Sequence, residues 1–415
     1  MNGFDAKSHL KLGLAQMPAS SRTDTLVVGA GPQALTVLGR WLSDRPACLH
    51  NLLVVDPAGT WMRTWKKSFA QQSIDVLRSP GVHHPDPDEM AFVNAYPQGE
   101  EFKTDSLFKG LATSIGPLRR PTTAAFGQFC QDLLCRTGLV DRVIPATVTG
   151  LRLCSGPDCD YRWEVRLDNG AEVKARQVLW AGNPRALRRP SEVQFSESIL
   201  HSVQVDLRQV VPDQRIAVLG GGQTAGQLAL GAARRGAEVI LVSRGPRRIA
   251  DLDVDAGWLM EDRLMPFRSI ESPIRRRRVV ELAQRGSITA DLDSQLCLER
   301  VQRISTAGDL SAWNDSNDVI VGFAGIECRV DQVWSATGSC ADLRVDPALA
   351  LFAEQGAPHV DGWPVLDKNL DWGNGLAFVG GLAALTLGPA AGNLGGARAA
   401  AEILASRGPR VGSEA

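Results

Sequence analysis

The alternation of hydrophobic and polar segments divides the chain into two similar strand–helix–strand units. The first unit runs from the apolar segment TLVVG (25–29) through a helical pattern at 32–44 to a second buried strand in LLVVDPAG (52–59). The second unit repeats this order, with RIAVL (215–219) and EVILV (238–242) on either side of an alanine-rich helical segment. Continuous apolar runs of this length are typical of parallel strands buried on both faces. Each unit is therefore predicted to be a βαβ unit.

The rest of the chain is less regular. Residues 60–120 are rich in proline, histidine and aromatic residues, and a long irregular stretch of this kind is more often functional than disordered. One helix is predicted over 123–138, and mainly helical structure over 250–300. Further strands, followed by a terminal helix from 388, are predicted at 148–154, 161–182, 331–339 and 376–382.

The first βαβ unit contains the loop Gly29-x-Gly31-x-x-Ala34. Its first glycine allows a tight turn, its second lets a pyrophosphate approach the backbone, and the small third residue lets the helix pack on the strand. The N-terminus of that helix offers free N–H groups and a partial positive charge to the phosphates. Asp56 ends the next strand, where an acid binds the ribose hydroxyls of an adenosine. The predicted dinucleotide site comprises Gly29, Gly31, Pro32, Gln33, Asp56 and Pro57.

The second unit contains a similar loop, Gly220-x-Gly222-x-x-Ala225, but its next strand ends in Ser243-Arg244 instead of an acid. An acid there would repel a 2′-phosphate, whereas an arginine binds it through charge-assisted hydrogen bonds. The second ligand is therefore predicted to be NADPH, although these arginines could also simply coat a surface loop. The predicted site comprises Gly220, Gly222, Gln223, Thr224, Ser243, Arg244, Arg247 and Arg248.

The different residues after the two loops predict two different cofactors. The first loop, near the irregular aromatic segment and completed by the C-terminal strand, fits FAD, to which NADPH on the second loop would deliver hydride. The predicted fold is α/β, with two Rossmann-like dinucleotide-binding domains and the NADPH domain inserted in the FAD domain. The predicted segments are an N-terminal arm (1–23), the FAD domain (24–210 and 330–407), the NADPH domain (212–329) and a C-terminal tail (408–415).

Composition narrows the class of protein. With 45 basic and 46 acidic residues, the net charge of −1 gives no electrostatic reason to expect a nucleic-acid or membrane partner. No apolar run approaches the roughly 18 residues that span a bilayer, and the N-terminus lacks the apolar core of a signal peptide. The eight cysteines do not suggest a disulfide framework, and no residues have the spacing of a metal site. We expect a cytoplasmic protein with a small-molecule substrate; whether it forms a homo-oligomer stays open.

The order and spacing of these motifs resemble the two-dinucleotide-binding-domain flavoproteins, from residue 24 to about 407. Within them, the chain resembles the flavin-dependent monooxygenases, which include flavin-containing monooxygenases, Baeyer–Villiger enzymes and lysine/ornithine N-hydroxylases. GTWMRTW (59–65) is similar to the family's segment beside the isoalloxazine ring, SATG (335–338) to its second Ala-Thr-Gly turn, and FVGGL (378–382) to the segment before its final helix. The resemblance implies further FAD contacts from Trp61, Trp65, Gly381, Leu382 and Pro389.

The chain departs from the signatures of the individual branches. The pattern Phe-x-Gly-x-x-x-His-x-x-x-aromatic is met at Phe195 and His201, but Glu197 and Val205 replace its glycine and its aromatic residue. Ser339 follows SATG, where the N-hydroxylases continue into tyrosine. These differences weigh against a Baeyer–Villiger enzyme and leave the substrate open.

Two residues are candidates for direct chemistry. His84 follows the segment that the resemblance places along the flavin, so it is a candidate for contact with the flavin edge or the substrate. Asp253 lies in the segment 251–267, which could cap a pocket between the domains and let this carboxylate, or that of Asp255, polarise a substrate amine. An ordinary interdomain linker is an equally good interpretation of that segment.

The resemblance implies an FAD-dependent monooxygenase that consumes NADPH. In that family, O₂ adds to the reduced flavin, and the flavin hydroperoxide transfers one oxygen to a small substrate with a nucleophilic nitrogen or sulfur. Two other functions fit the sequence. One is an NADPH-dependent reductase or oxidase that passes electrons to a quinone, O₂ or a protein acceptor. The other is a non-catalytic nucleotide-binding regulator that senses NADPH.

Overall fold

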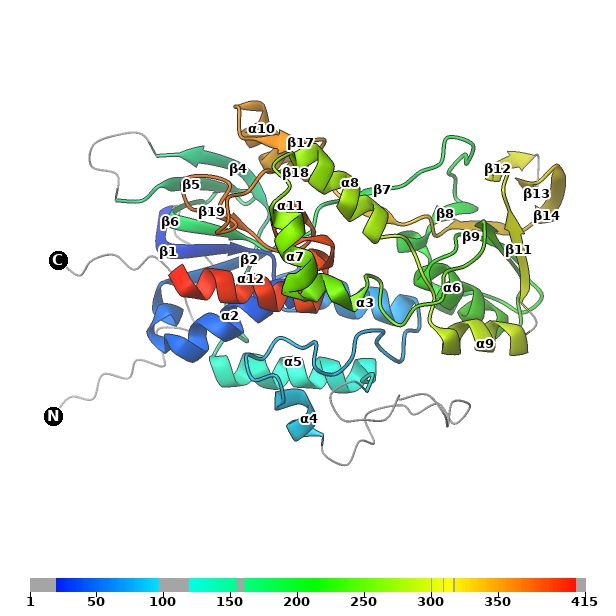
Figure 1. Cartoon of the computed structure of the whole chain (residues 1–415), viewed down its shortest axis with the longest axis horizontal. Helices are drawn as coiled ribbons and strands as arrows, with labels where there is room; N and C mark the ends of the chain where they lie inside the picture. Colours follow the sequence, from blue (N-terminus) through cyan, green and yellow to red (C-terminus); the bar gives the residue numbers. More distant parts are fainter. Residues whose placement is uncertain are drawn as a thin grey trace.

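Two sheets, each flanked by its own helices, form the two halves of the molecule (Figure 1). The computed structural model describes residues 20–96, 119–154, 160–299, 301–308, 310–315 and 318–407. Each half contains one predicted βαβ unit, with the glycine-rich loop between its first strand and its helix. The prediction of an α/β fold with two Rossmann-like units is therefore confirmed.

The first sheet is built around β2 (Leu52–Asp56), β1 (Ser20–Val28) and β6 (Glu172–Trp180), which pair in parallel. β19 (Leu376–Phe378) returns from the far end of the chain and also pairs with β6 in parallel. The remaining strands are β3 (Val143–Pro145), parallel to β2, and the antiparallel strands β5 (Trp163–Leu167) and β4 (Val148–Leu153).

Strand β1 begins earlier than the sequence predicts. Residues 20–23 pair with residues 172–175 of β6, so they belong to the first sheet and not to the predicted arm. The other residues of that arm, 1–19, and the predicted tail, 408–415, lie outside the described residues.

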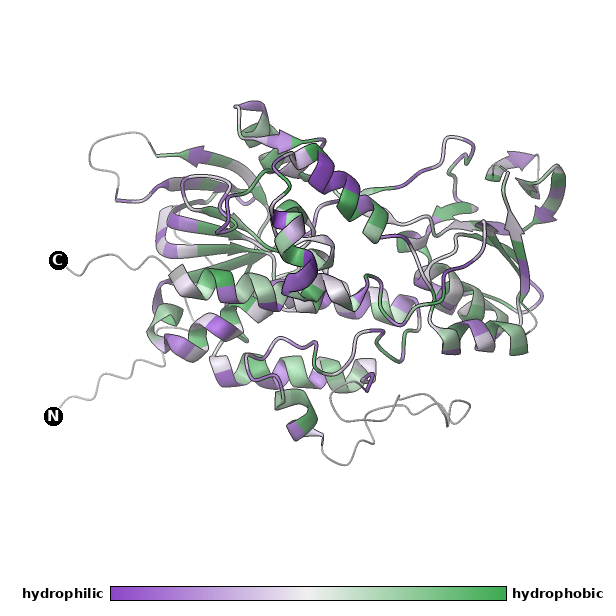
Figure 2. Ribbon diagram, in the orientation of Figure 1, coloured by the Kyte–Doolittle hydropathy of each residue, from purple (hydrophilic) through white to green (hydrophobic). Residues whose placement is uncertain are grey.

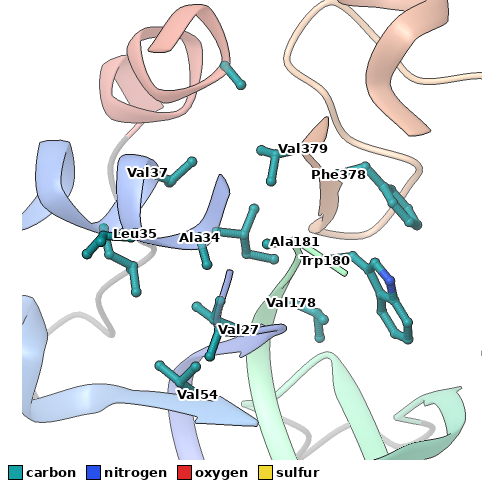
Figure 3. Close-up of a cluster of buried hydrophobic side chains, with 14 of the residues drawn as sticks. Val27, Ala34, Leu35, Val37, Val54, Val178, Trp180, Ala181, Phe378 and Val379 are labelled. Atoms are coloured by element: carbon teal, nitrogen blue, oxygen red, sulfur yellow. The ribbon is translucent and has the colours of Figure 1, made fainter. Parts of the chain in front are cut away.

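Helix α2 (Pro32–Asp44) lies beside α12 (Leu394–Arg407), and α5 (Thr123–Thr137) packs against α2 (Figure 1). Beneath α2, Ala34 and Val37 gather with Val27 of β1 and Val178 of β6 in a close-packed core (Figure 3). Because Ala34 is small and fully buried, α2 can approach the strands closely and its first turn is fixed relative to the sheet. The shorter helices of this half are α3 (Arg63–Gln71), α4 (Ala91–Ala95), α10 (Pro347–Glu354) and α11 (Ala384–Leu387).

The final helix starts later than predicted. Pro389 opens a separate 3₁₀ turn, η8 (Pro389–Gly392), and not the helix itself. Helix α12 begins only at Leu394, because the Asn393 side chain accepts a hydrogen bond from the Gly396 N–H (2.9 Å) and so caps the new first turn.

The second sheet consists of five parallel strands, of which β9 (Arg215–Leu219) is central. Ile216 and Val218 pack under helices α6 (Gln223–Ala233) and α9 (Ala290–Leu298), whereas Ala217 and Leu219 pack against a three-stranded sheet on the other face. The sheet order is β11 (Gln302–Thr306), β10 (Glu238–Arg244), β9, β15 (Gln332–Ser335) and β8 (Ile199–His201). The three-stranded sheet contains β12 (Leu310–Asp315), β13 (Asp318–Phe323) and β14 (Ile326–Val330).

Strands β8 and β15 fall on the other side of the predicted domain boundaries. We assigned both to the FAD domain, but they extend the second sheet, because β15 pairs with β9 and β8 pairs with β15. The chain instead crosses between the halves at β7 (Arg185–Leu187) and β16 (Ser339–Ala341), which pair in antiparallel fashion. We therefore propose that the second domain extends from about 188 to 338.

Helices α7 (Glu261–Arg268) and α8 (Pro273–Ala283) pack on the first half, where Phe267 and Val280 join its core (Figure 1). Figure 2 shows hydrophobic residues along the strands of both sheets, whereas α8 carries the hydrophilic run of residues 275–278. Of these arginines, Arg276 donates to the carbonyls of Arg268 and Ile270, and Arg277 pairs with Glu281. The short strands β17 (His359–Val360) and β18 (Trp363–Pro364) complete the described part of the chain.

Candidate cofactor cleft between the two halves

A cavity of about 890 Å³ opens between the two halves. From the second half it is lined by the second glycine-rich loop (220–224), the end of β10 (243–246), the loop 284–287 and the turn 336–339. From the first half it is lined by Gly381, Pro389, Gly392 and Asn393. Segments that are distant in sequence therefore meet in one space. It contains the second glycine-rich loop together with Gly381 and Pro389 of the predicted FAD site, whereas the first glycine-rich loop and Asp56 do not line it.

The second glycine-rich loop faces this cavity. Gly220 has a φ of +153°, and a Cβ there would lie 2.5 Å from the Ala336 carbonyl oxygen, so only glycine fits. Gly222 precedes the first turn of α6, which has neither a side-chain cap nor an acidic residue. The first N–H groups of α6, which lie at the positive end of the helix dipole, are thus available to an anion such as a pyrophosphate.

The arginines after β10 do not all behave as predicted. Arg244 and Arg248 line the cavity and are exposed to it, as a site for a 2′-phosphate requires. Arg247 does not line the cavity; its Nε lies 3.2 Å from Asp293 in an ion pair. The sequence could not separate these arginines, because only the positions of Asp293 and the cavity distinguish their surroundings.

Two other predicted NADPH contacts also bind the protein itself. The Ser243 hydroxyl is buried and donates to the Gly245 carbonyl (3.0 Å), which shapes the turn after β10. The Gln223 side-chain oxygen accepts from the Thr289 N–H (3.0 Å), which joins α6 to α9. Both residues line the cavity, so they shape the loop and leave their remaining polar groups to a ligand.

The first glycine-rich loop is built in the same way. Gly29 has a φ of +102°, and a Cβ there would lie 2.9 Å from the Gly182 nitrogen. Gly31 has no atom within 4 Å of the position that a Cβ would take, and it precedes α2, which has no side-chain cap. Pro32 is the first residue of α2 and lacks an N–H, as is common at this position. The loop therefore leaves a backbone cradle at the N-terminus of α2, and a phosphate fits this cradle.

Asp56 is held by this loop. One of its carboxylate oxygens accepts from the Ala30 N–H (2.9 Å) and the other from the Ala58 N–H (2.8 Å), beyond Pro57. Because each carboxylate oxygen can accept two hydrogen bonds, Asp56 can brace the loop and still receive a ribose hydroxyl.

Gln33 provides the clearest polar contact for a ligand in the first half. Its amide nitrogen donates to the carbonyls of Gly392 and Asn393, both at 3.2 Å, and so connects α2 to the segment before α12. Its side-chain oxygen is buried and has no hydrogen-bond donor within reach among the described residues. A buried acceptor of this kind needs a partner, and a bound FAD would supply one.

The residues that the resemblance places along the flavin have more varied positions. Trp61 is buried and donates from its indole N–H to the Leu139 carbonyl (2.8 Å), and Trp65 stacks on Phe69 with ring centroids 4.4 Å apart. Neither tryptophan lines the cavity between the halves. Leu382 is buried, whereas Gly381 lines the cavity at a point where a Cβ would lie 3.1 Å from that of Ala341.

His84 lies elsewhere, so its prediction as a residue at the flavin edge is corrected. The side chain is completely buried, and its Nδ1 accepts from the Asp86 N–H (3.2 Å). The proton is therefore on Nε2, which donates to the Glu89 carbonyl (3.1 Å). Burial lowers the pKa of His84. With both nitrogens engaged and Phe129 packed on the ring, His84 stabilises its own loop and has no free position for catalysis.

Asp253 does line the cavity, but its carboxylate forms an ion pair with Arg78 from the first half. The charge with which it would polarise a substrate amine is therefore balanced within the protein. His201, the histidine of the monooxygenase pattern, is also buried, and its Nε2 lies 3.2 Å from the carbonyl of Gly338, whose turn lines the cavity.

Sequence reasoning missed three arginines of the cavity, Arg185, Arg188 and Arg285. Arg185 donates to the hydroxyl (2.7 Å) and the carbonyl (3.1 Å) of Ser339, across the two crossing strands. Desolvation by the surrounding protein lowers the pKa of Arg185. The basic run at residues 185–189 was a signal for this position, since it lies where the chain leaves the first sheet.

Three comparisons with known proteins bear on this geometry. The cadaverine monooxygenase of desferrioxamine biosynthesis from Erwinia amylovora, solved with FAD, superposes with a TM-score of 0.71 at 16% identity, over 92% of this chain and 94% of that one. The ornithine N-hydroxylase of Kutzneria sp. 744 gives 0.68 at 17% identity, over 93% and 98%. The flavin-containing monooxygenase of Stenotrophomonas maltophilia gives 0.59 at 17%, over 93% and 99%.

The chain has the fold of the two-dinucleotide-binding-domain flavoproteins. A family model described as NADP oxidoreductase coenzyme F420-dependent matches residues 215–265, which contain the second glycine-rich loop and the arginines after β10. A search of curated protein sequences finds no match. No helix in the described ranges is long and apolar enough to cross a membrane.

Proposed function

We propose that this chain is an FAD-dependent monooxygenase that consumes NADPH and transfers one oxygen atom from O₂ to a nucleophilic nitrogen or sulfur of a small substrate. The observation that carries the proposal is the shared cavity. It places the arginines after β10 and the uncapped end of α6 in one space with Gly381 and Pro389 of the first half. A nicotinamide bound on one side would thus face a flavin bound on the other. The structural relatives named above, which are monooxygenases and an N-hydroxylase, support this interpretation.

The residues of the first half fit FAD. Gly29 and Gly31 leave a cradle at the end of α2, Asp56 lies where the adenosine ribose would bind, and Gln33 has a buried acceptor that lacks a donor. FAD held there would supply the redox chemistry that activates O₂ with electrons from NADPH.

The residues of the second half fit NADPH. The N–H groups at the start of α6 would bind the pyrophosphate, and Arg244 and Arg248 would bind the 2′-phosphate through charge-assisted hydrogen bonds. An acid at the end of β10 would favour NADH, and the chain has none there.

The protein's own contribution is to bind, orient and exclude water. Of the two predicted catalytic side chains, His84 is buried in its own loop and Asp253 is paired with Arg78. We infer that positioning of the cofactors and substrate in the cavity carries most of the rate enhancement that the protein supplies. The cytoplasmic location remains a prediction, and so does the possibility that the protein forms a homo-oligomer.

An oxygen-incorporation experiment tests the proposal. The purified protein, with FAD measured by absorbance, is supplied with NADPH, ¹⁸O₂ and a set of amines, amino acids and thioethers. We expect one NADPH consumed per product, with one ¹⁸O atom in that product. NADPH consumption that yields only H₂O₂ or reduced quinone with every substrate would instead support the reductase or oxidase. A protein that never binds flavin would support the nucleotide-sensing regulator.

A further inference from the structure

Arg78 connects the first half to the loops that form the NADPH side of the cavity. It lies after α3, in a segment that is fixed to the strand-like residues before α5: the Leu77 N–H donates to the Pro121 carbonyl (2.9 Å), and Gly81 N–H to that of Arg119 (2.7 Å). Its side chain is only 11% exposed. The guanidinium therefore reaches the second half from a rigid base.

All five N–H donors of Arg78 are used in that contact. Nε donates to the Asp251 carbonyl (2.9 Å), and the terminal nitrogens donate to the carbonyls of Ala250 (2.8 Å) and Ser287 (3.1 Å). They also donate to the Ser287 hydroxyl (2.7 Å) and to the carboxylate of Asp253. Because an arginine has five such donors in a planar fork, and a lysine only three on one nitrogen, no other side chain can make this set of bonds.

The partners of Arg78 belong to two loops, 245–254 and 284–287, that line the cavity together. These loops are also joined to each other, since the Ala250 N–H donates to the Ile288 carbonyl (3.0 Å) and the Ile288 N–H to that of Arg248 (2.8 Å). The Arg248 guanidinium in turn donates to the Arg285 carbonyl (3.3 Å). A contact that fixes one of these loops therefore also fixes the other, and with them the positions of Arg248 and Arg285 in the cavity wall.

The second loop also covers the phosphate cradle. A Cβ on Gly222, before α6, would lie 3.5 Å from the Cα of Gly286. The loop 284–287 thus lies directly over the point where a pyrophosphate would bind, and a shift of this loop would change the space between α6 and the arginines.

We propose that Arg78 is a positioning residue for the nucleotide: from the first half, it holds the loops of Arg248 and Arg285 in the geometry in which Arg248 binds the 2′-phosphate of NADPH. This inference rests on the proposed function. Arg78 itself does not line the cavity, so it acts through the loops and not by touching the nucleotide. Nucleotide selection would then depend on contact between the halves as well as on the residues after β10.

Arg120 provides a matched control. It also joins the two halves, through an ion pair with Asp291 of α9 (2.8 Å), and both side chains are partly buried. Neither residue lines the cavity, and Asp291 belongs to a helix on the far side of the loop 284–287 in sequence. Loss of the Arg120 bond should weaken the contact between the halves without moving the two arginines.

The experiment compares Arg78→Lys and Arg120→Lys with the unmodified protein as FAD-loaded enzymes. The affinities for 2′,5′-ADP and 5′-AMP are measured from their competition with NADPH. The KM and kcat for NADPH and for NADH are measured from the rate at which each nucleotide is consumed. We expect Arg78→Lys to weaken 2′,5′-ADP binding and raise the NADPH KM by about tenfold or more, with 5′-AMP binding and kcat changed less than about twofold. Arg120→Lys should leave the preference for 2′,5′-ADP unchanged.

The outcomes separate the two proposals. If the unmodified protein binds 2′,5′-ADP no better than 5′-AMP, the proposed NADPH site is wrong, and the role of Arg78 falls with it. If the unmodified protein prefers 2′,5′-ADP and Arg78→Lys keeps that preference, the NADPH site stands and the role of Arg78 is overturned. Equal losses of both nucleotides in Arg78→Lys would also overturn it, because they would indicate general damage to the second half. Should Arg78→Lys fail to fold, Ser287→Ala, which removes one acceptor of Arg78, is expected to show the same selective loss to a smaller degree, and an unselective loss contradicts the proposal.

Discussion

The two glycine-rich loops are built in a similar way, but the residues at the end of the strand that follows each loop make different contacts. In the first half, Asp56 is bound by the N–H groups of Ala30 and Ala58, so the acid is part of the loop structure. In the second half, Ser243 turns back to the Gly245 carbonyl, and Arg244 is left exposed in the cavity. The same local fold therefore provides a preformed acceptor in one half and an exposed cation in the other. Under the proposed function, the residues about twenty positions after each loop, and not the glycines, would select the ligand.

The largest effect is expected at Gly220. Because a Cβ would lie 2.5 Å from the Ala336 carbonyl oxygen and φ is +153°, Gly220→Ala should lower the free energy of unfolding by roughly 2–4 kcal/mol. NADPH binding should be lost as well, while FAD remains bound to the first half. Denaturant unfolding and the flavin absorbance of the purified variant measure the two results. A variant as stable as the parent would show that Gly220 and Ala336 do not have the tight backbone contact described above.

At Gly31, a substitution should reduce FAD binding while leaving the stability of the protein nearly unchanged. A Cβ there meets no atom within 4 Å, so Gly31→Ala should leave the melting temperature within about 2 °C of the parent. The added methyl group would nonetheless occupy the phosphate cradle, so FAD content after purification should fall at least about tenfold. Flavin content per chain is the measurement, with Gly127→Ala, also in open space but in the middle of α5, as the control. Full FAD content in Gly31→Ala would place the flavin elsewhere.

The two arginines after β10 provide a sharper test within the second half. Arg244→Ala should lower kcat/KM for NADPH by about 10- to 100-fold and leave the value for NADH within about twofold, since only NADPH carries the 2′-phosphate. Arg247→Ala should change the ratio of the two values much less, because Arg247 is paired with Asp293 outside the cavity. Steady-state kinetics with both nucleotides decides the matter. Equal effects of the two substitutions would contradict the assignment of Arg244.

The smallest effect concerns one buried histidine in each half. His84 and His201 are both buried and have pKa values lowered by desolvation. Below the ordinary pKa of about 6.5, the unfolded chain binds protons that the folded chain does not, so stability falls as the pH drops from 6.5. The loss amounts to at most about 1.4 kcal/mol per histidine per pH unit, until the lowered pKa is reached.

Urea midpoints measured at pH 7.5 and pH 5.5 check this expectation. The parent should be less stable at pH 5.5, and His84→Asn and His201→Asn, although less stable at both values, should each lose less on acidification. A midpoint in either variant that drops as far as that of the parent would mean that the corresponding histidine does not contribute to the pH dependence.

The sequence predicts the local structure of this protein well. The bounds of α2 at 32–44 and the end of β2 at Asp56 agree with the pattern, because proline, glycine and continuous apolar runs set these limits within a few residues. The membership of β8 and β15 in the second sheet could not be predicted in this way. Parallel pairing is a contact between distant segments, and both strands have only three or four residues.

The candidate site could be predicted only in part, for a related reason. Gly220 and Arg244 belong to a motif with fixed spacing, and both lie in the cavity. His84 was chosen for its residue type and its position after the flavin segment, but its partners, Asp86 and Glu89, bury it in its own loop. Arg78 was missed because a single arginine in an irregular segment has no periodic signal. Only the folded chain shows that all five of its donors are used.

The pairing of β7 with β16 brings the two ends of the second half together, so this half could be excised from the chain. Leu187 and Ser339 are direct neighbours in an antiparallel pair, so the whole second half occupies the place of a hairpin turn between them. A two-residue turn of the Asn-Gly kind could connect them after excision of residues 188–338. The shortened chain would keep every strand of the first sheet, and with them the cradle at α2 and the buried acceptor of Gln33. In architectural terms, the second half is an insert that carries no strand of the first sheet, although its helices α7 and α8 contribute Phe267 and Val280 to the core of the first half.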